Sequence, residues 1–282
     1  MNRLLLPLLI ATLGASPAED GWRPLLNGKD LSGWETWLTK PHRSSTFEGL
    51  AKNEKGDYSE ALGLNRDPHQ VFSIVSEDGR PALRISGEVW GGISTTEEFE
   101  NYHFRAEFKW GQKKWPPREK TVRDNGLLYH GVGPHGAGSG AWLKSFEMQI
   151  QEHDCGDFHS VAGVLVDVEA VPKDPSKPQG DLLYRKGAPK VTGVARRIWK
   201  DPDNEKPSGE WNVVEIYCYG QTSVHVVNGQ VTMVLSGLRH KVGNQVVPLT
   251  KGRIQIQSES AEIFWRTIDV RPITEIPSKI LD

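Results

Sequence analysis

The chain has 282 residues, with 34 basic and 36 acidic side chains, a formal charge of −2 and 37% hydrophobic residues. This balance is ordinary for a globular protein and argues against a polycationic nucleic-acid binder. The 29 glycines and 18 prolines follow no collagen-like period and indicate a folded, turn-rich chain. Ten tryptophans are many for this length, so we expect some of their rings to line a surface or a cleft.

The first 18 residues are predicted to be a secretory signal peptide. The apolar stretch 4–13 is shorter than the roughly 20 residues needed to span a bilayer, but it suits the hydrophobic region of such a signal. Small side chains at Ser16 and Ala18 predict cleavage after Ala18, with Ala15 as the alternative. We therefore expect export to the periplasm or beyond, and no membrane span after processing. The alternative is a retained N-terminal anchor.

After residue 20 the apolar pattern has period two, which is typical of an all-β protein. Many strands separated by turns favour an antiparallel β-sandwich or jelly roll. The strongest hairpin signal is Asn228-Gly229, because this pair readily adopts the positive φ angles of a type I′ turn. The predicted strands are 71–75, 82–86, 102–110, 146–150, 211–219, 222–227, 230–235, 252–257 and 263–270.

We expect residues 19–282 to form a single domain. On strand 102–110, alternation places Phe104, Ala106, Phe108 and Trp110 on the inner face. Two stretches break the strand pattern, 111–124 and 172–209, and are predicted to be long surface insertions. Long loops in compact domains often shape binding sites.

Polar side chains alternate with apolar ones along the segment 144–153. Phe146, Met148 and Ile150 share one face, so the other face presents Glu147, Gln149 and Gln151, with His153 in phase if the strand continues. Amides are poor strand formers and bring mainly hydrogen bonding, so this row favours a surface for a polyhydroxylated ligand. A second row follows the same pattern in Arg253, Gln255 and Gln257. The alternative is an ordinary solvated outer face.

The segment Asn125–Gly131 leads into a glycine-rich loop. A phosphate site would need a helix after this loop, whereas Trp142 leads into a strand. We predict that Tyr129 and His130 edge the same cleft as Glu147. The alternative is a plain connection between strands.

The segment 152–159 is dense in side chains that can bind metals. Cys155 beside His153 matches no usual zinc template, whereas oxygens of Asp154 and Asp157 could suit Ca²⁺. The alternative is a turn closed by the two Asp side chains. The sequence requires no cofactor, and it leaves open whether Cys155 pairs with Cys218.

Several motifs together resemble the 3-keto-disaccharide hydrolase family, whose members are exported bacterial proteins with a concanavalin A-like lectin/glucanase jelly roll. The most specific parts are residues 22–34, with the sequence WRPLLNGKDLSGW, and the strand Phe146–Ile150. The likeness continues through 125–129, 210–212 and 252–268 and so spans nearly the whole mature chain. Where the family often has Gln-Asp-His-Gly, this chain has Gln257-Ser258-Glu259-Ser260, so no histidine role is transferred there.

The resemblance implies cleavage of glycosides oxidised at C3 of the sugar. A C3 ketone acidifies the C2 proton, so a base can remove that proton and the C1 aglycone can leave. Water addition then completes a net hydrolysis, and stopping earlier would make the enzyme a lyase. We expect Glu147 or His153 to be the base, with His130 or Tyr129 assisting. Predicted substrate-binding residues are Asn125, Tyr129, Gln149, Gln151, Arg253 and Gln257.

Two alternatives remain open at this stage. A non-catalytic carbohydrate-binding module would share the fold. A conventional glycosidase would need a second acid facing Glu147, at about 5–5.5 Å for retention or 6.5–9.5 Å for inversion of the anomeric carbon.

Overall fold

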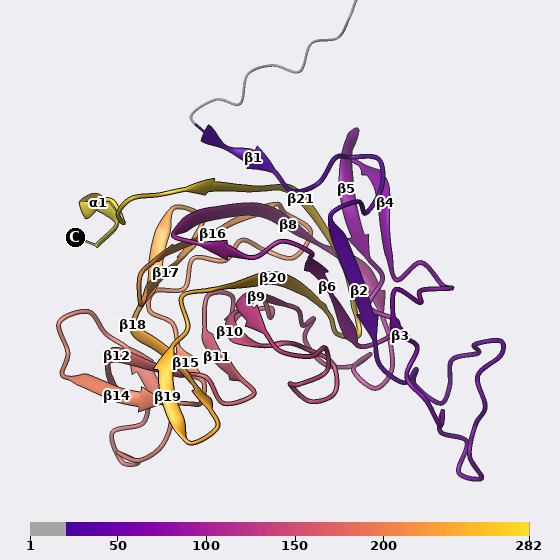
Figure 1. The fold of residues 1–282 in the computed structure, drawn as a ribbon, viewed down its shortest axis with the longest axis horizontal. Helices are drawn as coiled ribbons and strands as arrows, with labels where there is room; N and C mark the ends of the chain where they lie inside the picture. Colours follow the sequence, from indigo (N-terminus) through magenta and orange to yellow (C-terminus); the bar gives the residue numbers. More distant parts are fainter. Residues whose placement is uncertain (1–20, 282) are drawn as a thin grey trace, which may run out of the picture.

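The computed structural model describes residues 21–281, so the predicted signal peptide lies outside the described residues. As predicted, the protein is a jelly-roll β-sandwich (Figure 1). Its one described helix is α1 (Ser278–Leu281), and no helix within residues 21–281 is long and apolar enough to cross a bilayer. Figure 1 shows the strands of one sheet arching over those of the other.

The sheet that we call the outer sheet has the strand order β4-β5-β21-β8-β16-β17-β18-β12-β14, with β1 added to β21 and β19 added to β18. Its strands are β1 (Arg23–Pro24), β4 (Phe72–Glu77), β5 (Arg80–Ile85), β8 (Tyr102–Lys114), β12 (Leu165–Pro172), β14 (Lys190–Val194), β16 (Asn212–Tyr219), β17 (Thr222–Val227), β18 (Gln230–Val242), β19 (Gln245–Pro248) and β21 (Ala261–Pro272).

The inner sheet has the order β3-β2-β6-β20-β9-β10-β11-β15-β13, and β12 also pairs with β13, which joins the two sheets. The short strand β7 pairs with the start of β20. The strands are β2 (Trp34–Leu38), β3 (Gly63–Leu64), β6 (Gly91–Thr95), β7 (Phe99–Glu100), β9 (Gly126–Val132), β10 (Lys144–Gln149), β11 (Phe158–Val161), β13 (Leu182–Tyr184), β15 (Ile198–Trp199) and β20 (Lys251–Ser258).

The apolar core lies between the two sheets. The predicted inner row of β8, from Phe104 to Trp110, is buried there at 2% exposure or less, which confirms the alternation. The predicted hairpin is also present: Asn228 and Gly229 join β17 to β18 with φ angles of 50° and 80°. Cys155 and Cys218 are both buried in this core as free thiols.

The two predicted insertions contribute to the sandwich. Residues 111–114 continue β8, and the loop that follows carries Arg118 to the edge of the inner sheet. The stretch 172–209 contains β13, β14 and β15, of which β15 pairs with β11.

Candidate active site

The inner sheet has one face in the core and one polar face. On β10, Phe146 and Met148 belong to the core, whereas Glu147 and Gln149 point to the other side. On β20, Ile254 and Ile256 likewise belong to the core. We call the opposite side, with Arg253, Gln255, Gln257 and Glu147, the polar face. Glu147 and Gln149 of the first predicted row therefore lie on one face with the second row, Arg253, Gln255 and Gln257.

Two amides hold the carboxyl group of Glu147 at one oxygen. Gln257 Nε2 donates to Glu147 Oε1 at 2.9 Å. With its amide nitrogen facing the acceptors around it, Gln149 donates to the same oxygen at 3.0 Å. Gly126 lies on β9 beneath this contact, and a Cβ atom there would collide with Glu147 Oε1 and with Gln257. Glycine is therefore required where the two side chains meet over the strand, and Oε2 of Glu147 receives neither amide.

Three buried carboxyl groups lie close to one another, and one guanidinium pairs with two of them. Asp124, Glu147 and Glu259 retain 4%, 5% and 8% of their surface, and we call them the carboxylate cluster. Arg118 Nη1 pairs with Asp124 Oδ2 at 2.5 Å and with Glu259 Oε1 at 2.7 Å. Both acids act on the carboxyl group of Glu147, which is held by the amide of Gln257.

This imbalance changes the ionisation of the acids. Burial raises the pKa of Asp124 to about 6 and that of Glu259 to about 8, against the opposing attraction of Arg118. Burial also raises the pKa of Glu147 well above its ordinary value, and the nearby Glu259 and Asp124 raise it further. This shift favours the protonated form of Glu147, which can donate a proton.

The imidazole that shares the polar face with Glu147 is His159. It stands directly opposite Glu147 in the antiparallel pair of β10 and β11, where facing Cβ atoms are about 4.5–5.5 Å apart. Its Nε2 has no hydrogen-bond partner among the described residues. Burial lowers the pKa of His159 to about 4, and the charge of Arg197 adds to the effect, so the ring is neutral and can accept a proton.

His153, predicted to continue the polar row, does not lie on it, and that prediction is wrong. The strand β10 ends at Gln149, and residues 151–156 form a turn in which His153 is exposed with a φ of 74°. Its backbone amide donates to Glu205 at 2.7 Å, and its carbonyl accepts from Lys200. The chain leaves the strand before the alternation can reach position 153.

Tyr129 and His130 were predicted to edge the cleft of Glu147, and this is also wrong. Both rings lie in the core, where Tyr129 Oη contacts Ser223 and His225, and His130 Nδ1 contacts the carbonyl of Leu249 at 3.1 Å. Tyr129 faces the core by regular alternation with Leu127 and lies opposite Phe146 of β10. His130 joins it because β9 is irregular at this point, with a φ of 50° at His130 and a shifted register opposite β10 and β20. Two consecutive side chains therefore lie on the same side of the sheet.

Asn125 and Gln151 support the site from its margin. Asn125 is fully buried, donates from Nδ2 to the carbonyl of Gln257, and accepts from Gln149 at its own carbonyl. It therefore positions the two amides that hold Glu147, and no part of it is open to a ligand. Gln151 is half-buried, bonds to Asp154 at 2.7 Å and accepts a longer contact of 3.5 Å from Arg118.

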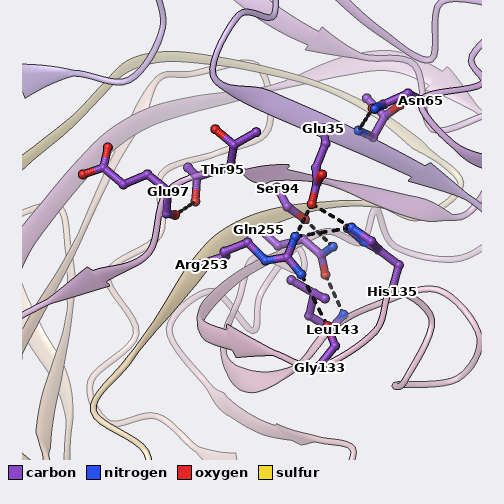
Figure 2. A network of polar contacts seen from close by, with 12 residues as sticks. Glu35, Asn65, Ser94, Thr95, Glu97, Gly133, His135, Leu143, Arg253 and Gln255 are labelled. Atoms are coloured by element: carbon purple, nitrogen blue, oxygen red, sulfur yellow. Dashed lines mark hydrogen bonds and ion pairs between the residues drawn. The ribbon is translucent and has the colours of Figure 1, made fainter.

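The remaining predicted residue, Arg253, lies at the other end of β20 in a separate network (Figure 2). Its guanidinium pairs with Glu35 of β2, and His135 Nε2 donates to the same Glu35 oxygen at 2.9 Å. Between the two ends, Gln255 donates to Ser94 and accepts from the amide of Leu143. We call Glu35, His135 and Arg253 the Arg253 network.

The two acids predicted as Ca²⁺ ligands are paired with an arginine side chain of the protein. Asp154 and Asp157 both pair with Arg197, at 2.8 and 2.5 Å. Within residues 21–281 no group of three His, Cys, Asp or Glu side chains is arranged to hold a metal ion.

A cavity of about 710 Å³ opens beside Pro116 and Pro117, in the loop that also carries Arg118. We call it the side cavity. It is lined by residues of the segments 39–43, 57–61, 88–90, 116–117 and 139–140. Trp90 in its wall donates from its indole nitrogen to Ser260 Oγ at 2.6 Å, one residue from Glu259.

Sequence reasoning missed His159, Asp124, Glu259 and Arg118 as parts of the site. A signal for His159 was present, because a hairpin over 146–161 would pair it with Glu147. Arg118 belongs to a run of basic residues that reads as a solvated surface, and the contacts that bring it to Asp124 and Glu259 are set by tertiary structure.

The family model described as the 3-keto-alpha-glucoside-1,2-lyase-like domain matches residues 21–271. A comparison with curated proteins found no match. The match spans every strand except the last residue of β21, and it includes every residue of the carboxylate cluster, together with His159.

Several solved structures share the sandwich at low identity. A protein of Parabacteroides distasonis with a provisional glycosyl hydrolase designation is 14% identical over 90% of this chain and 94% of its own, with a TM-score of 0.47. The carbohydrate-binding module CBM66 of Bacillus subtilis is 7% identical over 71% and 91%, with a TM-score of 0.41. The β-glucanase of Bacillus licheniformis is 8% identical over 90% and 97%, with a TM-score of 0.39. At these values the likenesses carry no argument about the reaction.

Proposed function

Because the chain belongs to the 3-keto-alpha-glucoside-1,2-lyase-like domain family, we propose that it cleaves glycosides whose sugar is oxidised at C3. The reaction begins with removal of the C2 proton and ends with loss of the C1 aglycone. The observation that carries this proposal is the pairing of Glu147 with His159 across β10 and β11. Their environments move the two pKa values apart in the directions that an acid and a base require.

In the proposed reaction, His159 is the base. The neutral ring takes the C2 proton, and the electron pair of the C–H bond is delocalised onto the C3 oxygen as an enolate. Arg118 and Arg197 flank this region and supply positive charge near the developing anion. The almost complete burial of the carboxylate cluster lowers the local dielectric and strengthens these interactions.

Glu147 is the proposed acid. As the enolate collapses, a C1–C2 double bond forms and the C1–O bond breaks. The departing oxygen takes the proton of Glu147, which leaves a carboxylate and an imidazolium on the enzyme. Transfer of the proton from the imidazolium to the carboxylate, directly or through water, restores both groups. Addition of water to the unsaturated product then gives the net hydrolysis product.

The test compares a methyl 3-keto-glucoside with the unoxidised methyl glucoside and follows release of methanol. We expect turnover of the keto substrate alone, with exchange of the C2 hydrogen in deuterated water. Positioned proton transfer contributes about 10²–10⁴-fold, so His159→Asn is expected to lose turnover by that factor. The matched control is His153→Asn in the exposed turn, which should leave turnover unchanged.

Two outcomes would contradict the proposal. Cleavage of the unoxidised glucoside would indicate a conventional glycosidase. Binding of both glucosides without release from either would indicate a carbohydrate-binding module.

A further inference from the structure

Two parts of the wall of the side cavity adjoin residues that contact the carboxylate cluster. Pro116 and Pro117 line the cavity, and the next residue, Arg118, pairs with Asp124 and Glu259. Trp90, also in the wall, bonds to Ser260, the neighbour of Glu259. The cavity is therefore the pocket whose wall is tied to the cluster, and it is where we look for the group that leaves the sugar.

The wall consists largely of flat apolar surfaces, supplied by Pro41, Tyr58, Trp90, Pro116 and Pro117. Trp90 is fixed by its bond to Ser260 and by stacking on Trp142, with ring centroids 6.0 Å apart. Rigid flat rings and prolines are suited to stacking against another flat ring.

Of the charged side chains in the wall, Lys40 is exposed without a side-chain partner among the described residues, and the others are paired. Arg43 pairs with Asp57 at 3.0 Å, and Glu88 contacts His69 at 3.2 Å. His42 is bonded to Ser44. A second sugar would bring several hydroxyl groups, and each would need a free hydrogen-bonding partner in this wall.

From this chemistry we propose that the side cavity binds the aglycone and that its preferred occupant is an uncharged aromatic group. The volume of about 710 Å³ lies within the 300–1,000 Å³ typical of pockets for drug-sized ligands, so it accommodates more than one ring. This assignment rests on the proposed function, because the aglycone is the leaving group of the proposed reaction.

The test fills the cavity and compares two substrates. Ala61 is a small residue in the wall, and Ala61→Trp would occupy the space of the aromatic ring. The matched control is Ala51→Trp, on the same segment but exposed and outside the wall. For each protein, kcat/KM is measured with methyl and 4-nitrophenyl 3-keto-glucosides. Dividing the variant value by that of the unmodified protein cancels the intrinsic difference between the two leaving groups.

We expect Ala61→Trp to lower kcat/KM for the 4-nitrophenyl substrate by at least about tenfold and to change it for the methyl substrate by less than about threefold. Ala51→Trp should change neither. Equal losses on both substrates, or no loss on either, would overturn the proposal while leaving the proposed function intact. A tenfold loss with a 3-keto-disaccharide and none with the aryl substrate would overturn the aromatic assignment.

Ser139→Trp, at another position in the wall, repeats the test if Ala61→Trp fails to fold. If the unmodified protein cleaves neither keto substrate, the proposed function itself fails, and the assignment of the cavity fails with it.

Discussion

The two ends of β20 carry similar side chains in opposite electrostatic situations. At one end, Gln257 reaches Glu147, and Arg118 pairs with only two of the three clustered acids, Asp124 and Glu259. At the other end, one acid, Glu35, is met by both Arg253 and His135. Charge is balanced in the Arg253 network and unbalanced in the carboxylate cluster.

Charge balance therefore distinguishes a structural polar group from a reactive one on the same face of the sheet. Buried acids without enough positive charge have raised pKa values, and such groups concentrate at functional sites. A balanced network of the same residue types serves instead to tie β2, β20 and the loop after β9 together. Residue type alone does not distinguish the two ends.

The largest expected effect is on turnover at the unbalanced end. Glu147→Gln removes the proposed acid but keeps its shape, its neutral state and its acceptor for Gln257. We expect kcat to fall by about 10²–10⁴-fold, while the free energy of unfolding changes by less than about 1 kcal/mol. Steady-state aglycone release and urea unfolding measure the two quantities. Retained turnover with a large loss of stability would make Glu147 a structural residue.

The second prediction concerns the pH dependence of stability at the unbalanced end of β20. The pKa of Glu259 is raised from 4.5 to about 8, so the folded protein holds a proton that the unfolded chain releases. The stability that this proton provides is therefore complete below about pH 4.5 and is lost as the pH rises through about 8. Glu259→Gln lacks this titration. The free energy of unfolding of Glu259→Gln, minus that of the unmodified protein, should therefore increase as the pH rises, by at most about 1.4 kcal/mol per pH unit.

Urea unfolding of both proteins at pH 5, 6.5 and 8 gives this difference. The buried histidines His130, His159 and His225 have lowered pKa values of about 4, so their contribution to stability falls below about pH 6.5. Because both proteins contain them, this contribution cancels in the comparison. A difference that stays constant with pH would show that Glu259 is already ionised in the folded protein.

The sequence was sufficient to predict the parts of the site that depend on regular alternation. Glu147 and Gln149 on one strand, and Gln257 on another, lie on one face because a regular strand sends alternate side chains to opposite sides. The fold class follows from the same signal repeated along the chain, combined with turn signals such as Asn228-Gly229.

The errors occur where the backbone leaves regular geometry. The irregularity at His130 turns its ring into the core, and the turn after Gln149 removes His153 from the row. An alternating sequence pattern predicts neither the irregularity within β9 nor the point at which β10 ends. The contacts of Arg118 join residues up to 141 positions apart, so no local pattern indicates them. The sequence therefore indicated the correct face of the sheet, whereas the choice of histidine required the structure.

The smallest expected effect belongs to the balanced end. Glu35→Gln removes the charge that meets Arg253 and His135, whose side chains are only 18% and 11% exposed. We expect a loss of about 1–2 kcal/mol in the free energy of unfolding, since Arg253 and His135 both lose their charged acceptor. Turnover should change by less than about threefold, because this network lies apart from Glu147 and His159.

Combining Glu35→Gln with Arg253→Met gives a double-mutant cycle, in which a non-additive stability change identifies the pair as the source of the loss. If Glu35→Gln instead reduced turnover as strongly as Glu147→Gln while leaving stability unchanged, both ends of β20 would act on the substrate. Charge balance would then be the wrong criterion for separating structural from reactive acids on this face.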